Sequence, residues 1–177
     1  MTGAVDADLG VAIEAAAAGD DVAFARIVAA HHEDMRRVCV VMTRDEPLAD
    51  DAVQSAWSIA WRKLGTLKDP ARLRPWLVSV AVNQAKDMLR KRRRTPETGI
   101  DASTARVTGG VDPATGIESL DLLAAMDHLD PEDRALIAMR YVAGFDATEL
   151  AAAIGLSPSG TRTRLERALD RLRQELA

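Results

Sequence analysis

Residues 146–164 read DATELAAAIGLSPSGTRTR, and this stretch decides which kind of fold the chain must build. Asp146 and Glu149 match a capping box at the start of a short helix, with an acceptor at the cap and a glutamate three positions later. Gly155 is placed to end that helix, and Ser157 with the proline after it is placed to begin the next one. The spacing predicts a helix-turn-helix, whose second helix fits the major groove of duplex DNA.

The second helix of this motif carries hydroxyl and guanidinium groups on its first turns. Arginine can read guanine through two hydrogen bonds, and serine or threonine can contact phosphate. A helical hairpin with a solvated arginine face is the alternative interpretation. The candidate DNA-contacting residues are Ser157, Ser159, Gly160, Arg162, Thr163, Arg164 and Arg167.

Helical periodicity of apolar residues continues upstream of the motif, and no stretch alternates with the period of a strand. The pattern predicts long helices over residues 24–42, 53–64 and 73–94. Gly65 is expected to end the second of these in a left-handed cap, and Asp69-Pro70 is expected to begin the third.

A change of composition divides the chain. Residues 95–117 are rich in Thr, Gly, Ala, Asp and Pro and have no periodicity, which predicts a flexible linker. Helical signals resume after it. We therefore expect an all-α fold of two small helical domains, residues 1–94 and 118–177, joined by that linker.

The charge is segregated along the chain, although the net charge is only −4. Residues 1–61 carry a net −7, residues 62–94 +9, residues 95–133 −8 and residues 134–177 +2. A protein that is acidic as a whole can still bind nucleic acid through its basic stretches. The acidic stretches repel phosphate and suit a basic protein partner.

The third predicted helix ends in the basic run 90–94, and all three tryptophans of the chain lie on it or on the helix before it. Positive charge beside aromatic rings suits single-stranded DNA, because bases stack on the rings while the backbone follows the charge. Trp57, Trp61 and Trp76 all have core spacing, however, so a structural role for them is the stronger interpretation. Asn83 and Gln84 are polar enough to read base edges.

Several motifs resemble those of extracytoplasmic-function sigma factors of bacterial RNA polymerase. They are the opening Gly19–Phe24, the segment Ala49–Leu64, the helix Trp76–Arg90, and Leu129–Arg134 followed by the helix-turn-helix through Ala168. Each motif is modest alone, but their order and separation make the match specific. The resemblance implies a promoter-recognition subunit of RNA polymerase that directs transcription initiation, responds to stress, and has no catalytic activity or cofactor of its own.

The resemblance also implies partners and residue roles. The partners are core RNA polymerase, promoter DNA (a duplex minus-thirty-five element and a single-stranded minus-ten element) and an anti-sigma factor. The helix-turn-helix would read the minus-thirty-five element, and the loop 65–74 with Asn83 would capture an unpaired minus-ten base. The implied polymerase-binding residues are Asp50, Asp51, Gln54 and Trp57. The implied minus-ten residues are Trp61, Lys63, Arg72, Arg74, Asn83, Lys86, Arg90, Arg92 and Arg93.

Three positions depart from the family's usual residues: Ser55 where glutamate is frequent, Thr161 where a β-branched aliphatic is common, and Leu169 where arginine is common. The first weakens the expectation of one polymerase contact. The other two could change promoter preference without threatening the fold.

Other classes of protein are disfavoured. We expect no metal site, because His31 and His32 point about 100° apart on a helix. No Gly-rich phosphate loop or nucleophile with a matching base is present. The single cysteine, Cys39, and the absence of a signal pattern or a membrane-spanning apolar stretch predict a cytoplasmic protein without membrane insertion. A stand-alone helix-turn-helix regulator is the main alternative, and an inactive sigma-like interaction module is another.

Overall fold

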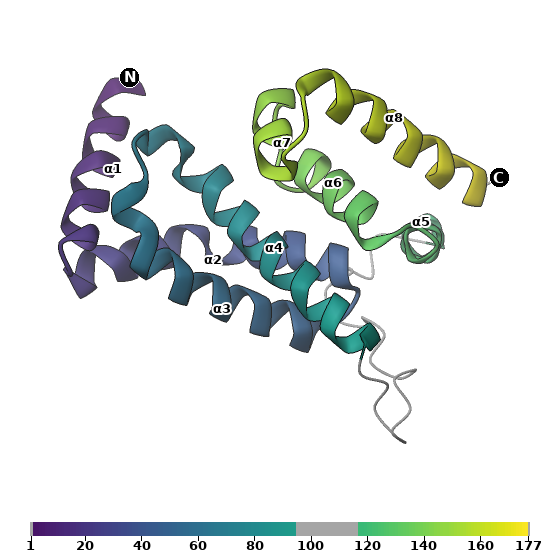
Figure 1. The fold of residues 1–177 in the computed structure, drawn as a ribbon, viewed down its shortest axis with the longest axis horizontal. Helices are drawn as coiled ribbons and strands as arrows, with labels where there is room; N and C mark the ends of the chain where they lie inside the picture. Colours follow the sequence, from purple (N-terminus) through teal and green to yellow (C-terminus); the bar gives the residue numbers. More distant parts are fainter. Residues whose placement is uncertain (1, 95–116, 177) are drawn as a thin grey trace.

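The computed structural model describes residues 2–94 and 117–176, with side chains for residues 9–94 and 121–176. Every regular element in these ranges is helical, which confirms the all-α expectation (Figure 1). The predicted linker lies outside the described residues, apart from Ile117. The helices are α1 (Thr2–Ala17), α2 (Asp21–Thr43), α3 (Glu46–Lys63), the 3-10 turns η1 (Leu64–Thr66) and η2 (Pro70–Arg72), α4 (Leu73–Arg94), α5 (Ile117–Asp127), α6 (Pro131–Tyr141), α7 (Ala147–Ile154) and α8 (Pro158–Glu175).

The helix-turn-helix forms as its local signals predict. The Asp146 carboxylate accepts hydrogen bonds from the backbone N–H groups of Thr148 and Glu149, and the Glu149 side chain accepts one from the Asp146 N–H at 2.8 Å. Gly155 ends α7 with a φ of 70°, a left-handed conformation that glycine adopts without steric cost. Ser157 then caps α8 by accepting from the Gly160 N–H at 3.1 Å. The capping box and both helix boundaries are confirmed.

Gly65 corrects one expectation. It does not end α3 in a left-handed cap: α3 ends at Lys63, and Gly65 lies in the 3-10 turn η1 without a positive φ. A Cβ atom built on Gly65 would lie 3.5 Å from the Cβ of Ala17, so the turn packs closely against α1. The helix α1 itself was not expected, because its apolar residues surround the helix instead of marking one face.

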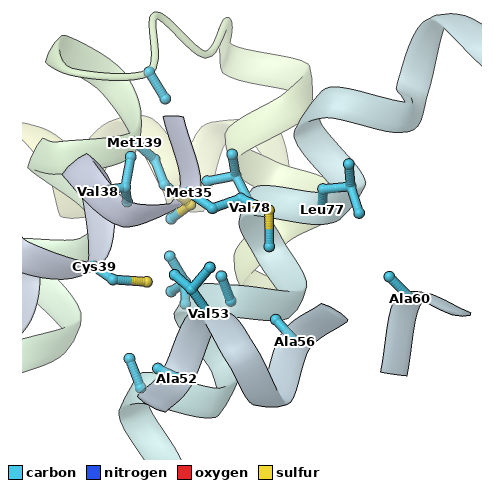
Figure 2. Packing of buried hydrophobic residues seen from close by; sticks show 14 of the residues in the cluster. Met35, Val38, Cys39, Ala52, Val53, Ala56, Ala60, Leu77, Val78 and Met139 are labelled. Carbon is cyan, nitrogen blue, oxygen red and sulfur yellow. The ribbon is translucent and has the colours of Figure 1, made fainter. Parts of the chain in front are cut away.

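The N-terminal group, α1 to α4, is held together by an apolar core between its helices. Small residues let α3 approach its neighbours closely: Ala49, Ala52, Ala56 and Ala60 are all fully buried. They pack with larger side chains of α2 and α4, such as Val38 and Leu77 (Figure 2). Burial of this apolar surface is the main source of stability for the group.

The C-terminal group, α5 to α8, packs onto the N-terminal group through α6. Met139 of α6 belongs to the same buried cluster as Met35 and Val38 of α2 (Figure 2). A second cluster has its buried residues in the C-terminal group, among them Ile137 and Leu172, and Val41 of α2 packs against it. The sequence had left the relative placement of the two groups open. The structure joins them through one continuous core.

Candidate nucleic-acid and polymerase interfaces

The outer face of α3 carries the predicted polymerase-binding residues. Asp50, Asp51 and Gln54 are exposed. Asp50 accepts a hydrogen bond from Arg36 Nε at 2.8 Å, and Glu46 accepts one from the same guanidinium at 3.0 Å. Asp51 and Gln54 form no hydrogen bond or ion pair between side chains in the described part of the chain, so they are free to meet a partner.

The aromatic residues divide between core and surface. Phe24 meets Trp57 and Trp61 edge to face, with ring centroids 5.8 and 4.7 Å apart. Trp57 is partly buried, and its Nε1 donates to Nδ1 of His32 at 3.2 Å. Trp61 is 38% exposed, so part of its ring is open to solvent. Trp57 is therefore chiefly structural, whereas Trp61 offers a surface on which a base could stack.

The residues predicted to contact the minus-ten element lie in the last turn of α3, in η2 and along α4. Lys63, Arg72, Asn83 and Arg93 are exposed, and Lys86 is partly exposed. Three others are held by carboxylates: Arg74 by Asp34 at 2.7 Å, Arg92 by Asp45 at 2.6 Å, and Arg90 by Glu132 at 3.0 Å. Arg72 also lies 3.5 Å from a carboxylate oxygen of Asp69. The set thus spans two helices and the segment between them, and carboxylates neutralise part of its positive charge.

The Arg74 side chain is fixed by α2. Asp34 accepts hydrogen bonds from both Arg74 and Arg37, and these donors hold the pKa of Asp34 below its ordinary value against the opposing effect of burial. Burial lowers the pKa of the neighbouring His31, whose Nδ1 is enclosed without a hydrogen-bond partner among the described atoms. Asp34 is the counter-ion of Arg74. Arg74 is thus positioned at the entrance of α4.

The first turns of α8 present most of the predicted minus-thirty-five residues to solvent. Ser157, Ser159, Arg162, Thr163 and Arg167 are exposed. Gly160 is partly buried beneath the cap, where an added Cβ would lie 3.2 Å from the Ser157 hydroxyl. The exposed side chains point outward from a capped, rigid helix start, which suits contact with a DNA groove.

Arg164 is the exception among the predicted minus-thirty-five residues. Its Nε donates to Asp133 at 2.9 Å and its Nη2 to Glu132 at 3.1 Å, both at the start of α6. Asp133 is 4% exposed and also accepts from Arg171 at 2.8 Å. The hydrogen bond from Arg164 is the main reason that the pKa of Glu132 lies below its ordinary value. These contacts give Arg164 a structural role, because they link α8 to the start of α6.

The departures from the family pattern have structural places. Thr161 is 1% exposed, and its hydroxyl donates to the Ser157 carbonyl oxygen at 2.9 Å, so it stabilises the start of α8 and faces away from a groove. Leu169 packs against the second apolar cluster. Ser55 is partly buried on α3.

Two family descriptions match these same parts of the chain. Sigma-70 region 2 matches residues 27–95, and Sigma-70, region 4, matches residues 119–172. The chain belongs to the sigma-70 family. In the family's terms, α2 to α4 form region 2, and α5 to α8 form region 4.

Curated relatives place it in the extracytoplasmic-function group of sigma factors. ECF RNA polymerase sigma factor SigM of Mycobacterium tuberculosis is 28% identical, over 94% of this chain and 82% of its own length. RNA polymerase sigma factor CarQ of Myxococcus xanthus is 29% identical, over 89% of this chain and 91% of its own. Probable RNA polymerase sigma factor RfaY of Xanthomonas campestris is 32% identical over 97% of this chain, which spans only 45% of that relative.

Solved structures show the same fold. CnrH, in complex with the cytosolic domain of CnrY, aligns with a TM-score of 0.69 and 26% identity, over 94% of this chain and 95% of CnrH. Sigma factor RpoE of Bartonella quintana, in complex with the anti-sigma factor NepR, aligns with a TM-score of 0.72 and 22% identity, over 86% of this chain and 96% of RpoE. Across residues 2–94 and 117–176, no helix is long and apolar enough to cross a membrane.

Proposed function

We propose that this sigma factor binds core RNA polymerase and directs initiation at promoters with separate minus-ten and minus-thirty-five elements. The observation that carries the proposal is the division of DNA-binding chemistry between two helices: a basic helix, α4, in region 2 and an exposed recognition helix, α8, in region 4. A stand-alone regulator needs only the second. We assign residues 1–94 to polymerase binding and minus-ten recognition, 95–117 to the connection, and 118–177 to minus-thirty-five recognition.

The polymerase-binding surface is the outer face of α3. Asp51 and Gln54 supply a carboxylate and an amide that are not committed within region 2, and Asp50 lies beside them at the Arg36 ion pair. A basic surface on the polymerase clamp would be the complementary partner. Trp57 supports this face from beneath, through its contacts with Phe24 and His32.

Minus-ten recognition combines the loop before α4 with the basic side of that helix. Trp61 offers a partly open ring for stacking, Asn83 offers an amide for a base edge, and Arg72 and Arg93 offer exposed positive charge for the backbone. Minus-thirty-five recognition uses Arg162 and Thr163 in the groove, with Ser159 and Arg167 toward the phosphates. The polymerase performs the nucleotide chemistry, so recognition and strand opening are the sigma factor's whole contribution.

Control by an anti-sigma factor follows from the family and from the structural neighbours, of which RpoE was solved with its anti-sigma factor NepR. We propose that an anti-sigma factor also binds this chain and releases it in response to stress.

Run-off transcription tests the proposed function. Core RNA polymerase is assayed with and without this protein on a library of promoter fragments. Transcripts that start downstream of a shared two-part motif support a sigma factor and reveal its promoter. Absence of transcripts, together with tight duplex binding by the protein alone, would favour the stand-alone regulator. Absence of both transcripts and duplex binding would favour an inactive sigma-like module.

A further inference from the structure

The loop 65–74, to which we assign capture of a minus-ten base, contains a hydrogen-bonded turn at its middle, η2. The Asp69 carboxylate accepts from the Ala71 N–H at 3.1 Å, and the Asp69 carbonyl oxygen accepts from the Arg72 N–H at 3.0 Å. Pro70 lies between these partners, and its ring fixes the backbone φ. Pro70 and Arg72 therefore belong to one turn, so a displacement of Pro70 would move Arg72 with it.

The helix α1 packs along this loop. Figure 1 shows α1 beside the segment that joins α3 to α4, and both turns of that segment, η1 and η2, contact it. Ile13 and Ala16 of α1 are 5% and 2% exposed, and they share the apolar core with Leu64, the first residue of η1. Burial of this apolar surface holds α1 against the start of the loop.

Two glycines lie where α1 and the loop approach closely. A Cβ atom built on the partly buried Gly10 of α1 would lie 3.6 Å from Cγ of Pro70, and one built on Gly65 would lie 3.5 Å from the Cβ of Ala17. Both are ordinary contact distances, so a methyl group fits at either place. A longer, branched side chain at Gly10 would press on the Pro70 ring.

The ends of the loop have separate anchors. Leu64 and Leu73, which flank it, are 1% and 0% exposed. Arg74 at its far end donates from Nε to Asp34 of α2 at 2.7 Å. Pressure on Pro70 would therefore shift the middle of the loop while both ends stay in place.

We propose that α1 is a positioning element for minus-ten recognition: through Gly10 and Ala17 it sets the place of the loop 65–74, and so decides which unpaired base the loop accepts. A binding site has to hold its contacting groups to within about 0.5 Å, so a small displacement that leaves the fold intact changes base preference. Gly10 acts through Pro70 and has no side chain that could read a base. The inference rests on the proposed function, because it takes this loop as the base-capture loop.

The test measures the base preference of the reconstituted holoenzyme. Core RNA polymerase with the full-length wild type or a variant transcribes a library in which both promoter elements are randomised and a barcode in each transcript identifies its promoter. Gly10→Ile places a β-branched side chain, which has one preferred χ1 rotamer in a helix, beside Pro70. Gly10→Ala adds only a methyl group. Val11→Ile is the matched control, because it places isoleucine at the neighbouring position, which is 65% exposed.

We expect Gly10→Ile to lower the discrimination between bases at one minus-ten position at least about fivefold, the lower end of what one good base contact contributes. Its minus-thirty-five preferences should equal those of the wild type, and Gly10→Ala and Val11→Ile should keep the wild-type preferences at both elements. A folded Gly10→Ile protein with the wild-type minus-ten preference would overturn the proposal. An equal loss of discrimination at both elements would also overturn it, because that result indicates general damage.

A second variant covers the case in which Gly10→Ile does not fold, as judged by circular dichroism and a thermal melt. Ala17→Ile adds the same side chain at an exposed position of α1 beside Gly65 and should also change the minus-ten preference. A folded Ala17→Ile protein with wild-type preferences would overturn the proposal. Run-off transcription by the wild type separates the two questions. Absence of wild-type transcripts rejects the proposed function, whereas wild-type transcription with unchanged preferences in the folded variants rejects only the positioning by α1.

Discussion

The guanidinium of Arg134 donates from Nε to the backbone carbonyl oxygen of Met42 over 2.8 Å, across 92 positions of sequence. The acceptor lies in the last turn of α2, where carbonyl groups lack helical partners. The same guanidinium donates through Nη1 to the carbonyl oxygens of Met126, Asp127 and Leu129. One buried side chain thus organises the turn between α5 and α6 and attaches it to region 2.

Replacing Arg134 with methionine should therefore destabilise the protein. Several buried carbonyl oxygens would lose their donor, and we expect a loss of about 2–3 kcal/mol in the free energy of unfolding. Urea unfolding followed by circular dichroism measures it. Arg173→Met is the control, because the Arg173 side chain is 71% exposed and should change stability by no more than about 0.5 kcal/mol. Equal effects of the two substitutions would contradict the role of Arg134.

Arg162 and Arg164 are two positions apart on α8 but should respond differently to alanine. Arg162→Ala should weaken discrimination among minus-thirty-five sequences by about 1–3 kcal/mol if it reads a base. Arg164→Ala should mainly lower the stability of region 4, because its partners are Asp133 and Glu132. Competition binding with duplex variants, beside thermal melts, separates the two effects. Unchanged discrimination in Arg162→Ala would refute its role in readout.

The outer face of α3 offers a matched pair of substitutions. Asp51→Asn and Gln54→Ala should lower affinity for core polymerase without changing promoter choice, because both side chains are exposed and uncommitted. Asp50→Asn removes the same charge as Asp51→Asn but also breaks the Arg36 ion pair, so it reports the cost of disturbing region 2. Polymerase affinity is measured by fluorescence titration. An altered promoter preference at normal affinity would contradict the assignment of Asp51 and Gln54.

Cys39 should be unreactive in the folded protein. Burial raises its pKa to about 12, and the thiolate is the reactive form, so alkylation at neutral pH has to wait for unfolding. Mass spectrometry after iodoacetamide treatment should show labelling that rises with urea in parallel with the loss of helical signal. Rapid labelling of the native protein would show that the thiol is accessible.

Glu132 should contribute to stability in a pH-dependent way. The hydrogen bond from Arg164, followed by Lys86 and Arg90, holds its pKa below the ordinary 4.5. A lowered folded pKa means that the contribution is fully present above pH 4.5 and is lost as the pH falls through the folded value. Urea unfolding from about pH 7 to about pH 3 should show a smaller acid loss for Glu132→Gln than for wild type. Parallel curves would show that Glu132 is not coupled to these cations in solution.

The sequence by itself determined the local structure, namely the helix caps and the turns. Capping at Asp146 and Ser157 and the turn at Gly155 depend on partners no more than four residues away, so the helix-turn-helix could be read from spacing alone. The all-α class and the gathering of basic residues on α4 also follow from short-range patterns.

Only the tertiary structure decided which charges are available. Arg162 and Arg164 look equivalent in sequence, but Arg164 is bound by carboxylates more than 30 positions away. Gly65 lies in the turn η1 beside Ala17 of α1, and the buried Arg134 donates to the Met42 carbonyl oxygen of α2. The physical reason is that ion pairs and desolvation depend on distance in space, whereas helix periodicity and capping depend on distance along the chain.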